Sequence, residues 1–169
     1  MQRRTLVPDD FDVPDVVEQP DFRLRMLTVN DLIKDYDAVM SSVERLTTVF
    51  GDESGWPHGL TLEQDLIDLG WHQKEFQERC SFAYTMMSPD DEICLGCVYV
   101  MPPYRGGVAV EEYDAAIYLW VRDSAFAAGL DETLYRFVRG WIDEVWPFER
   151  PAYPGRDIAW ADWRLLPKP

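Results

Sequence analysis

The chain has 169 residues, of which 47% are hydrophobic and 14% aromatic, and its formal net charge is −15. This composition excludes intrinsic disorder, and the length predicts one domain with a substantial core. The acidic excess argues against nucleic acid and against an anionic membrane surface as partners, because both are polyanions. No window of about 18 apolar residues is present, so no membrane-spanning helix is expected. The N-terminus lacks the apolar run of a secretory signal, and we expect a soluble cytoplasmic protein.

Three cysteines, Cys80, Cys94 and Cys97, raise the question of a metal or redox site. Cys94 and Cys97 have the spacing of a metal-binding pair, but they lie in the apolar run 93–100, which is typical of a strand. Residues three apart on a strand point to opposite faces. Because the chain has only two histidines, the sequence predicts buried reduced thiols and no bound metal.

The first elements can be predicted from apolar periodicity. Residues 1–21, rich in proline and acidic residues, are expected to form an extended lead-in to a single domain of residues 22–169. Alternating apolar and basic residues over 22–27 predict a half-buried strand. Apolar residues at helical spacing then predict a helix from about Asp31 to about Leu46.

A second helix and a hairpin are predicted next. Thr61 and Gln64 have the spacing of a capping box, so the helix should begin just after Thr61. The apolar runs 81–87 and 93–101 are separated by five residues of turn-forming type, which predicts a β-hairpin.

The stretch from Tyr113 to Trp146 is expected to organise the fold. Residues 115–121 predict a buried strand, residues 122–129 a turn of small residues, and the following residues an amphipathic helix that begins at Leu130 or Asp131. Its apolar stripe consists of Leu134, Phe137, Val138, Trp141, Ile142 and Val145. Free backbone N–H groups at such a helix start are suited to holding an anionic ligand.

The C-terminal region predicts one more short strand over 148–153, which Pro151 confines to a sheet edge or to its own end. An exposed edge there could pair with a second copy, which leaves a homodimer open. The order strand, helix, helix, hairpin, strand, helix, short strand predicts an α+β or α/β three-layer domain. Its central sheet should be mixed and mostly antiparallel.

These elements resemble the GNAT superfamily of acyl-CoA-dependent N-acyltransferases. Residues 22–27 are similar to the family's R-L-R-x-L opening, and residues 117–121 to its I-x-x-W-V strand. The sub-group that acetylates protein N-termini, antibiotics or diamines is the most similar. The resemblance implies the acyl-CoA N-acyltransferase fold, acetyl-CoA as cofactor, and a small-molecule or peptide amine as substrate.

The resemblance also implies cofactor-binding positions. The family's pyrophosphate-binding motif, Q/R-x-x-G-x-G/A, falls on Phe126, Ala127, Ala128, Gly129, Leu130 and Asp131, of which only Gly129 matches. Pantetheine binding by strand pairing falls on Leu119, Trp120 and Val121, and Arg122 at the strand end is a candidate phosphate ligand. Asp131 and Glu132 would repel a pyrophosphate, and Asp131 has a second explanation, because an aspartate at a helix start complements the helix dipole.

The catalytic positions are less well matched. Many family members carry a general-base glutamate where this chain has Ala116. Asp114 and Glu112 precede it on the same face if the strand extends back, so either is a candidate base acting through a water, Asp114 first. Tyr153 is the candidate acid by position, although an ordinary packed tyrosine is the alternative.

Two hypotheses about function follow. The first is an enzyme that transfers an acetyl group from acetyl-CoA to a primary amine, for which the acidic surface would favour a cationic acceptor. The second is a non-catalytic domain that keeps the fold, has lost coenzyme A binding and uses its cleft to bind another small molecule or a protein.

Overall fold

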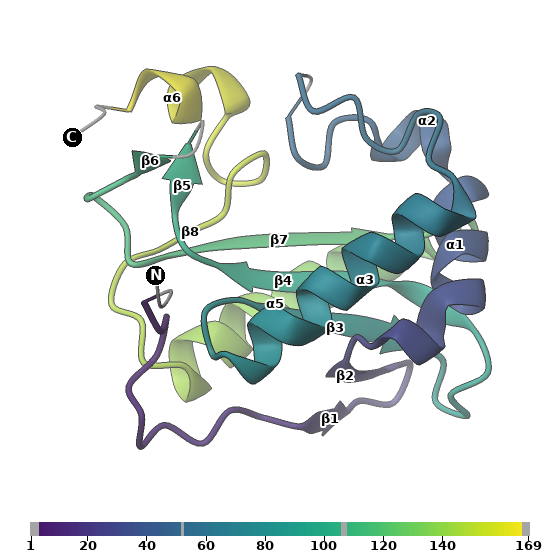
Figure 1. The fold of residues 1–169 in the computed structure, drawn as a ribbon, viewed down its shortest axis with the longest axis horizontal. Coiled ribbons are helices and arrows are strands. Elements are labelled where there is room, and N and C mark those ends of the chain that lie inside the picture. Colours follow the sequence, from purple (N-terminus) through teal and green to yellow (C-terminus); the bar gives the residue numbers. More distant parts are fainter. Residues whose placement is uncertain (1–3, 52, 106–107, 167–169) are drawn as a thin grey trace.

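The protein is built around one six-stranded sheet in the order β1-β2-β3-β4-β7-β8 (Figure 1). The structure, a computed structural model, describes residues 4–51, 53–105 and 108–166. The strands of this sheet are β1 (Val16–Glu18), β2 (Arg23–Met26), β3 (Phe82–Met87), β4 (Cys94–Met101), β7 (Ala115–Val121) and β8 (Pro151–Ala152). All neighbours are antiparallel except β7 and β8, which are parallel. A separate pair is formed by β5 (Tyr104–Arg105) and β6 (Val108–Ala109).

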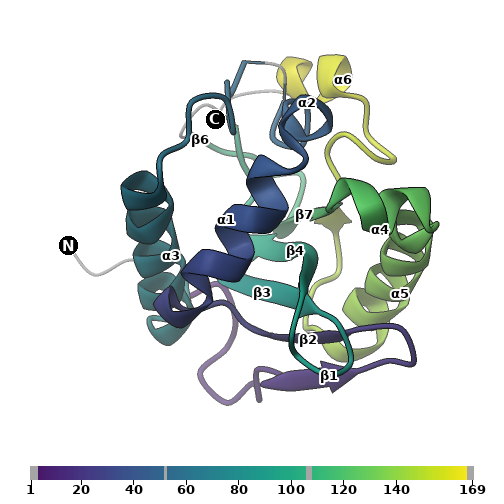
Figure 2. The same cartoon turned by 90° about the vertical axis from the view of Figure 1, so that its right-hand side faces the viewer.

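Helices cover both faces of the sheet, which therefore forms the middle of three layers (Figure 2). One face carries α1 (Leu32–Met40) and α3 (Leu62–Gln77), and the other carries α4 (Asp123–Ala127) and α5 (Leu130–Val145). Two short helices, α2 (Val43–Leu46) and α6 (Trp160–Leu165), lie at one end of the sheet. The predicted three-layer class with a mixed, mostly antiparallel sheet is confirmed.

Each face of the sheet has its own hydrophobic core, because alternate residues of a strand point to opposite faces. The core on the α5 side includes Tyr84, Val98, Ile117 and Leu119 from the strands and Leu134, Val138 and Ile142 from the helix. The core on the α1 and α3 side includes Ala38, Val39, Leu69, Ala83, Cys97, Tyr99 and Trp120. Among the described residues, no helix combines the length and the apolar character that crossing a bilayer requires.

The single helix predicted from Asp31 to Leu46 is wrong in its extent, because the chain breaks at Ser41 and Ser42. The Ser42 hydroxyl donates to the Ala38 carbonyl at 3.0 Å and accepts the N–H of Asp123 at 2.9 Å. A serine that bonds the backbone in this way competes with the helical ladder. The break thus fixes α2 next to the start of α4.

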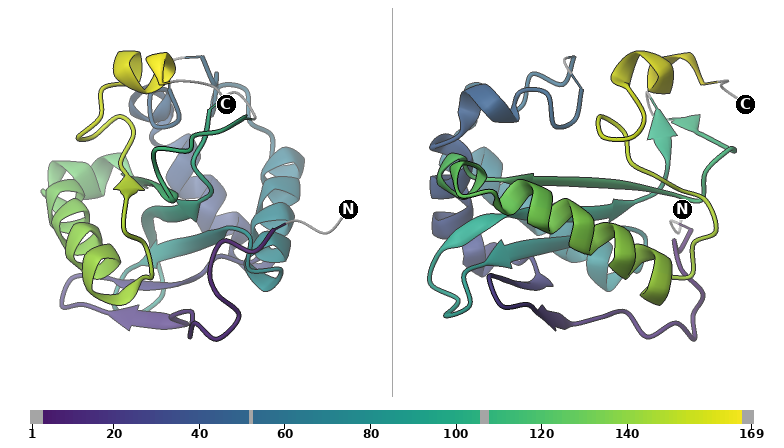
Figure 3. Two further views of the ribbon diagram at one scale, coloured as in Figure 1. Left: turned by 90° about the vertical axis from the view of Figure 1, so that its left-hand side faces the viewer. Right: turned by 180° about the vertical axis from the view of Figure 1, so that it is seen from behind.

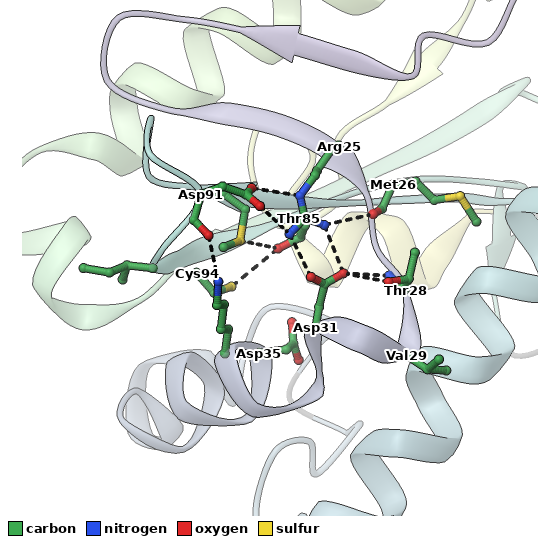
Figure 4. Close-up of polar contacts among 12 residues, drawn as sticks. Arg25, Met26, Thr28, Val29, Asp31, Asp35, Thr85, Asp91 and Cys94 are labelled. Carbon is green, nitrogen blue, oxygen red and sulfur yellow. Dashed lines mark hydrogen bonds and ion pairs between the residues drawn. The ribbon is translucent and has the colours of Figure 1, made fainter.

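The start of α1 is held by a partly buried arginine network (Figure 4). The Arg25 guanidinium donates to both Asp31 oxygens, at 2.8 and 3.1 Å, and to Asp91 at 2.8 Å. Asp31 also accepts the N–H of Thr28 at 2.9 Å. This guanidinium lowers the pKa of Asp91. The network anchors strand β2, the β3–β4 turn and the first turn of α1 to one another, and it therefore positions Asp35 one turn later.

The prediction that Cys94 and Cys97 point to opposite faces is wrong, because a β-bulge lies between them. Met86 pairs with Gly96 but Met87 pairs with Cys94, so Leu95 is an extra residue on β4. A bulge reverses the alternation of side chains, and both thiols point into the core beneath α1 and α3. The three cysteines are buried and none of them forms a disulfide, as predicted. The described residues contain no group of three or more side chains that could hold a metal ion.

The two ends of the chain extend the sheet. The predicted extended N-terminal segment contributes β1, an edge strand that pairs with β2, while Phe11 packs against Trp146 with ring centroids 5.4 Å apart. The strand predicted over 148–153 is reduced to two residues, Pro151 and Ala152. The homodimer stays a prediction. An edge strand this short offers little backbone for pairing with a second copy.

Candidate functional site

The edge of β7 that faces β8 is the first feature of the candidate site. The two strands pair only at Ala115 with Pro151 and at Ala116 with Ala152, and then they diverge. Among the described residues, the rest of β7, residues 117–121, has no strand neighbour on this side. A cavity of about 380 Å³ lies beside this free edge and reaches the start of α5. The residues that line it are Arg45, Thr48, Val49, Tyr118, Leu119, Phe126, Asp131, Pro154, Gly155, Arg156 and Trp160.

Two arginines bond the carbonyls of this free edge. Alternate residues of a strand direct their backbone polar groups to opposite sides, so those of Leu119 and Val121 point away from β4. Arg156, from the loop after β8, donates to the Leu119 carbonyl at 3.3 Å. Arg45, from α2, donates to the Val121 carbonyl. The edge left open by β8 is thus partly satisfied by the chain itself.

Each of these arginines also pairs with an aspartate in the first turn of a helix. Arg156 holds both oxygens of Asp131 on α5, at 2.6 and 2.8 Å. Arg45 donates to Asp123 on α4 at 2.8 Å, and its guanidinium lies 4.5 Å from the Phe126 ring. A carboxylate at a helix start is favoured by the helix dipole. Two arginine–aspartate pairs therefore join the β7 edge to the helix starts that face the cavity.

The turn between β7 and α5 keeps only one feature of the expected motif. Gly129 precedes α5 with φ of +81°, a left-handed conformation that favours glycine. No side chain caps this helix start. Of the predicted cofactor residues, Leu119, Phe126 and Asp131 line the cavity, and Val121 contributes its carbonyl to the edge. The other predicted cofactor residues do not line the cavity. Trp120 points to the core on the α1 and α3 side, and Leu130 packs against the core on the α5 side. Arg122 bonds Cys94 and Asp37, while the remaining three, Ala127, Ala128 and Gly129, are exposed.

None of the three predicted catalytic residues is among those lining this cavity. Asp114 accepts the backbone N–H groups of Glu149 and Arg150 at 2.8 and 3.0 Å, which ties the start of β7 to the segment before β8. Glu112 is exposed on a turn. Tyr153 is 1% exposed, and the Arg139 guanidinium lies 4.5 Å from its ring. Burial raises the pKa of Tyr153.

Among the cavity residues that sequence reasoning missed, four carry a cation or an aromatic ring: Arg45, Tyr118, Arg156 and Trp160. Tyr118 and Trp160 stack with an interplanar angle of 11°, and burial raises the pKa of Tyr118 to about 12. At neutral pH this phenol is protonated and can donate a hydrogen bond into the cavity. No local pattern marks these residues, because α2, β7 and the segment after β8 bring them together from distant parts of the chain.

A second cavity, of about 240 Å³, lies on the other side of the Phe50 ring. Phe50 contacts Tyr118, which lines the first cavity, and Tyr99, which lines the second, with ring centroids 5.5 and 5.3 Å apart. The second cavity is lined by Leu27, Asp35, Phe50, Trp56, Asp65, Asp68, Leu69, His72 and Tyr99. It therefore combines aromatic walls with three carboxyl groups and an imidazole.

Comparison with solved structures identifies similar folds at low sequence identity. A ribosomal-protein-S5-alanine acetyltransferase from Vibrio fischeri matches with a TM-score of 0.57 and 14% identity, over 78% of this chain and 67% of that one. RimL, a ribosomal L7/L12 alpha-N-protein acetyltransferase in complex with coenzyme A, also gives a TM-score of 0.57 and 14% identity, over 75% and 67%. A provisionally assigned ribosomal-protein-serine acetyltransferase from Vibrio cholerae gives 0.51 and 12%, over 73% of this chain.

At these identities the matches show a similar fold and nothing further. The chain spans 60% of the length of the Vibrio cholerae protein. By sequence, no protein-family model and no curated protein matches the chain. The matched structures are described as acetyltransferases, and their folds align with 73–78% of this chain. The chain thus has the fold of the GNAT superfamily of acyl-CoA-dependent N-acyltransferases.

Proposed function

We propose that the protein is an acyl-CoA-dependent N-acyltransferase that acts on a small amine. The observation that carries the proposal is the free edge of β7 beside a cavity of about 380 Å³ at the start of α5. A strand edge binds an extended amide-containing ligand through main-chain hydrogen bonds and needs no particular side chain. The fold shared with acetyltransferases, one of them in complex with coenzyme A, supports the same ligand.

The cavity fits the two ends of this cofactor unequally. Residues 117–121 of β7 offer the main-chain groups that a pantetheine arm would pair with, while Arg45 and Arg156 supply positive charge for phosphate. Asp131, in contrast, lies at the helix start that would receive the pyrophosphate. Two unit charges about 4 Å apart repel by roughly 4 kcal/mol at an effective dielectric near 20. Coenzyme binding therefore requires Arg156 to release Asp131 and to pair with the pyrophosphate instead.

Acetyl-CoA would supply an activated acyl thioester, and the chain would position the amine and move its proton. In this proposal the predicted roles stay predictions: Asp114 first and Glu112 second as the base, acting through a water, and Tyr153 as the acid. Both carboxylate oxygens of Asp114 already accept hydrogen bonds from the backbone N–H groups of Glu149 and Arg150. Tyr118 is the phenol that lines the cavity.

Calorimetric titration with acetyl-CoA and with free coenzyme A tests the proposal directly. We expect weak binding to the wild-type protein and at least tenfold tighter binding to Asp131→Asn, because this variant removes the repelling charge and frees Arg156. Glu132→Gln is the matched control. It removes the same charge from the same helical turn, but Glu132 is exposed and pairs with Arg136 instead, so its effect should be several-fold smaller.

A positive titration would be followed by an acetyl-transfer assay over a panel of primary amines. No heat at millimolar coenzyme with either the wild type or Asp131→Asn would overturn the acyltransferase proposal. Equal tightening by Asp131→Asn and Glu132→Gln would instead show that the Arg156 pair plays no specific part.

A second candidate function is a binding domain without acyl transfer. The specific observation that favours it is the occupation of the β7 edge, where Arg45 and Arg156 already bond the carbonyls of Val121 and Leu119. An edge satisfied internally gains less from pairing with a ligand, since an existing hydrogen bond must be broken for each new one. Under this alternative the cavities bind a different small molecule, and coenzyme A produces no heat.

A further inference from the structure

The second cavity has an acidic floor built by two helices. Asp65, Asp68 and His72 lie at positions i, i+3 and i+7 of α3, a spacing that places them on one face of the helix. Asp35 approaches them from α1, close enough for its carboxyl group and that of Asp65 to shift each other's pKa. The Cys97 thiol donates to the other side of Asp35 at 3.6 Å.

The carboxyl pair is buried without a cation. Asp35 is 4% exposed and Asp65 is 3% exposed. In the part of the chain that the structure describes, no lysine or arginine forms an ion pair with Asp35, Asp65 or Asp68. A buried charge is costly unless an opposite charge and hydrogen bonds compensate it. A positively charged ligand in this cavity would therefore be stabilised by the buried carboxyl pair.

Two buried polar atoms of side chains that line this cavity also lack a hydrogen-bond partner among the described residues. They are Oδ2 of Asp65 and Nδ1 of His72. Buried polar atoms in folded proteins nearly always have partners, so an exception needs an explanation. Here the two exceptions line the same space, next to the same carboxyl pair, and a ligand with N–H donors would satisfy both.

The protonation states agree with a single negative charge on the Asp35–Asp65 pair. Burial and the neighbouring Asp65 raise the pKa of Asp35 to about 8, and burial raises the pKa of Asp65 to about 6. Near neutral pH the pair therefore holds one proton and one charge. Burial lowers the pKa of His72, so its imidazole is neutral and Nδ1 can accept a hydrogen bond.

The walls select an organic cation over a metal ion. The described residues include no group that could hold a metal. Instead, Phe50, Trp56 and Tyr99 surround the space above the carboxyl pair, with Phe50 in edge contact with both other rings at 5.3 Å. Aromatic faces attract organic ammonium groups, and a desolvated contact of this kind contributes about 2 kcal/mol.

We propose that this cavity binds the ammonium group of a small primary or secondary amine, with the Asp35–Asp65 pair as its counter-charge and Phe50, Trp56 and Tyr99 as its walls. The two unpartnered acceptor atoms need N–H donors, which a quaternary ammonium group lacks. The inference does not depend on acyl transfer. The bound amine is the acceptor if the acyltransferase proposal holds, and it is the ligand itself under the alternative.

Calorimetric titration with n-butylammonium chloride at pH 7.5, in the absence of acetyl-CoA, tests this inference. Tetramethylammonium chloride and n-butanol are the comparison ligands, since one lacks N–H donors and the other lacks charge. We expect n-butylammonium to bind at least tenfold more tightly than either. The Asp65→Asn variant should lose at least tenfold in n-butylammonium affinity, because its neutral amide cannot compensate the ligand charge.

Glu63→Gln is the matched control, because Glu63 is an exposed carboxylate on the same helix. It removes the same charge from the surface, and we expect n-butylammonium affinity within about twofold of wild type. Thermal unfolding of Asp65→Asn checks that it folds, and removing a buried charge should leave its Tm unchanged or higher.

Two outcomes would overturn the inference. One is n-butylammonium binding no more tightly than n-butanol, which would show that the carboxyl pair contributes no counter-charge. The other is equal affinity of the wild-type protein and Asp65→Asn for n-butylammonium. Failure of acetyl-CoA to bind would be a separate result, since these titrations contain no coenzyme.

Discussion

At the scale of single residues, the least usual group is the carboxyl of Asp35. It lies on the buried face of α1, and the Cys97 thiol that donates to it is outweighed by burial and by neighbouring carboxyl groups that disfavour its charge. Burial is the largest cause of its raised pKa, followed by the carboxylates of Asp65 and Asp31. The nearby Arg25 forms its ion pair with Asp31 and not with Asp35, so it does not stabilise the charged form of Asp35.

This environment makes folding stability depend on pH. A carboxyl whose pKa is higher in the folded state than in the unfolded state binds more protons when folded, so stability falls as pH rises towards the folded value. Asp35, with a pKa of about 8, should lower the free energy of unfolding by about 1–2 kcal/mol between pH 6.5 and pH 8. Chemical denaturation at these two pH values measures the change.

The chosen pH window separates Asp35 from the groups packed around it. Asp65, with a pKa of about 6, is about three-quarters ionised at pH 6.5 and completes its titration early in the window. The lowered pKa of His72 makes stability rise slightly with pH near pH 6.5, which is opposite in sign to the effect of Asp35. Burial raises the pKa of both Cys94 and Cys97, whose effects begin above pH 8. In Asp35→Asn the pH dependence should be largely lost. An equally steep dependence in that variant would show that another group is responsible.

At the scale of elements, Gly96 has the least room for a side chain among the described glycines, because β4 lies close to β7 there. A Cβ atom there would lie 2.0 Å from the Trp120 carbonyl oxygen and 2.9 Å from the Val121 Cα. Both are backbone atoms, so the strands would have to separate. Gly96 also lies next to the β-bulge at Leu95, where the alternation of side chains between the two faces of β4 is shifted by one residue.

Gly96→Ala should therefore destabilise the protein by about 3 kcal/mol or more, which chemical denaturation will measure. The matched control is Gly140→Ala in α5, where a Cβ would meet no atom within 4 Å. The same substitution in a helix interior should increase stability by about 0.5–1 kcal/mol. Equal effects at the two positions would contradict the account of the β4–β7 contact.

At the scale of the whole molecule, one short parallel contact attaches the C-terminal segment to the sheet. After α5 the chain turns back to the start of β7 (Figure 3) and pairs with it over only two residues. Asp114 strengthens this attachment through the N–H groups of Glu149 and Arg150. Because Arg156 and Trp160 follow this point, the attachment also closes the cavity beside β7.

Asp114→Ala should loosen this segment without unfolding the protein. We expect faster amide hydrogen exchange over residues 148–160, and unchanged exchange in the β3–β4 hairpin, which is paired on both sides. Hydrogen–deuterium exchange with mass spectrometry resolves the two regions. Unchanged exchange over residues 148–160 would show that the two hydrogen bonds do not hold the segment.

Elements governed by local signals were predicted correctly from the sequence. The second helix begins at the predicted capping box, in which Gln64 N–H donates to the Thr61 hydroxyl at 3.2 Å and Thr61 N–H to the Gln64 side chain at 3.0 Å. The hairpin and the α5 helix were equally clear, because turn residues and apolar periodicity act within one stretch of chain. Four residues of the predicted α5 stripe are buried, Leu134, Val138, Trp141 and Ile142.

The sequence by itself thus determined the elements, the three-layer class and the acidic character of the chain. Only the tertiary structure decided what surrounds the candidate site. Arg156 meets Asp131 across 25 positions, Asp35 meets Asp65 from a different helix, and the bulge at Leu95 appears only in the register of β3 with β4. Periodicity reports which face of an element is buried, but not which other element covers it. The pairing of charges therefore depends on packing between elements that no local pattern encodes.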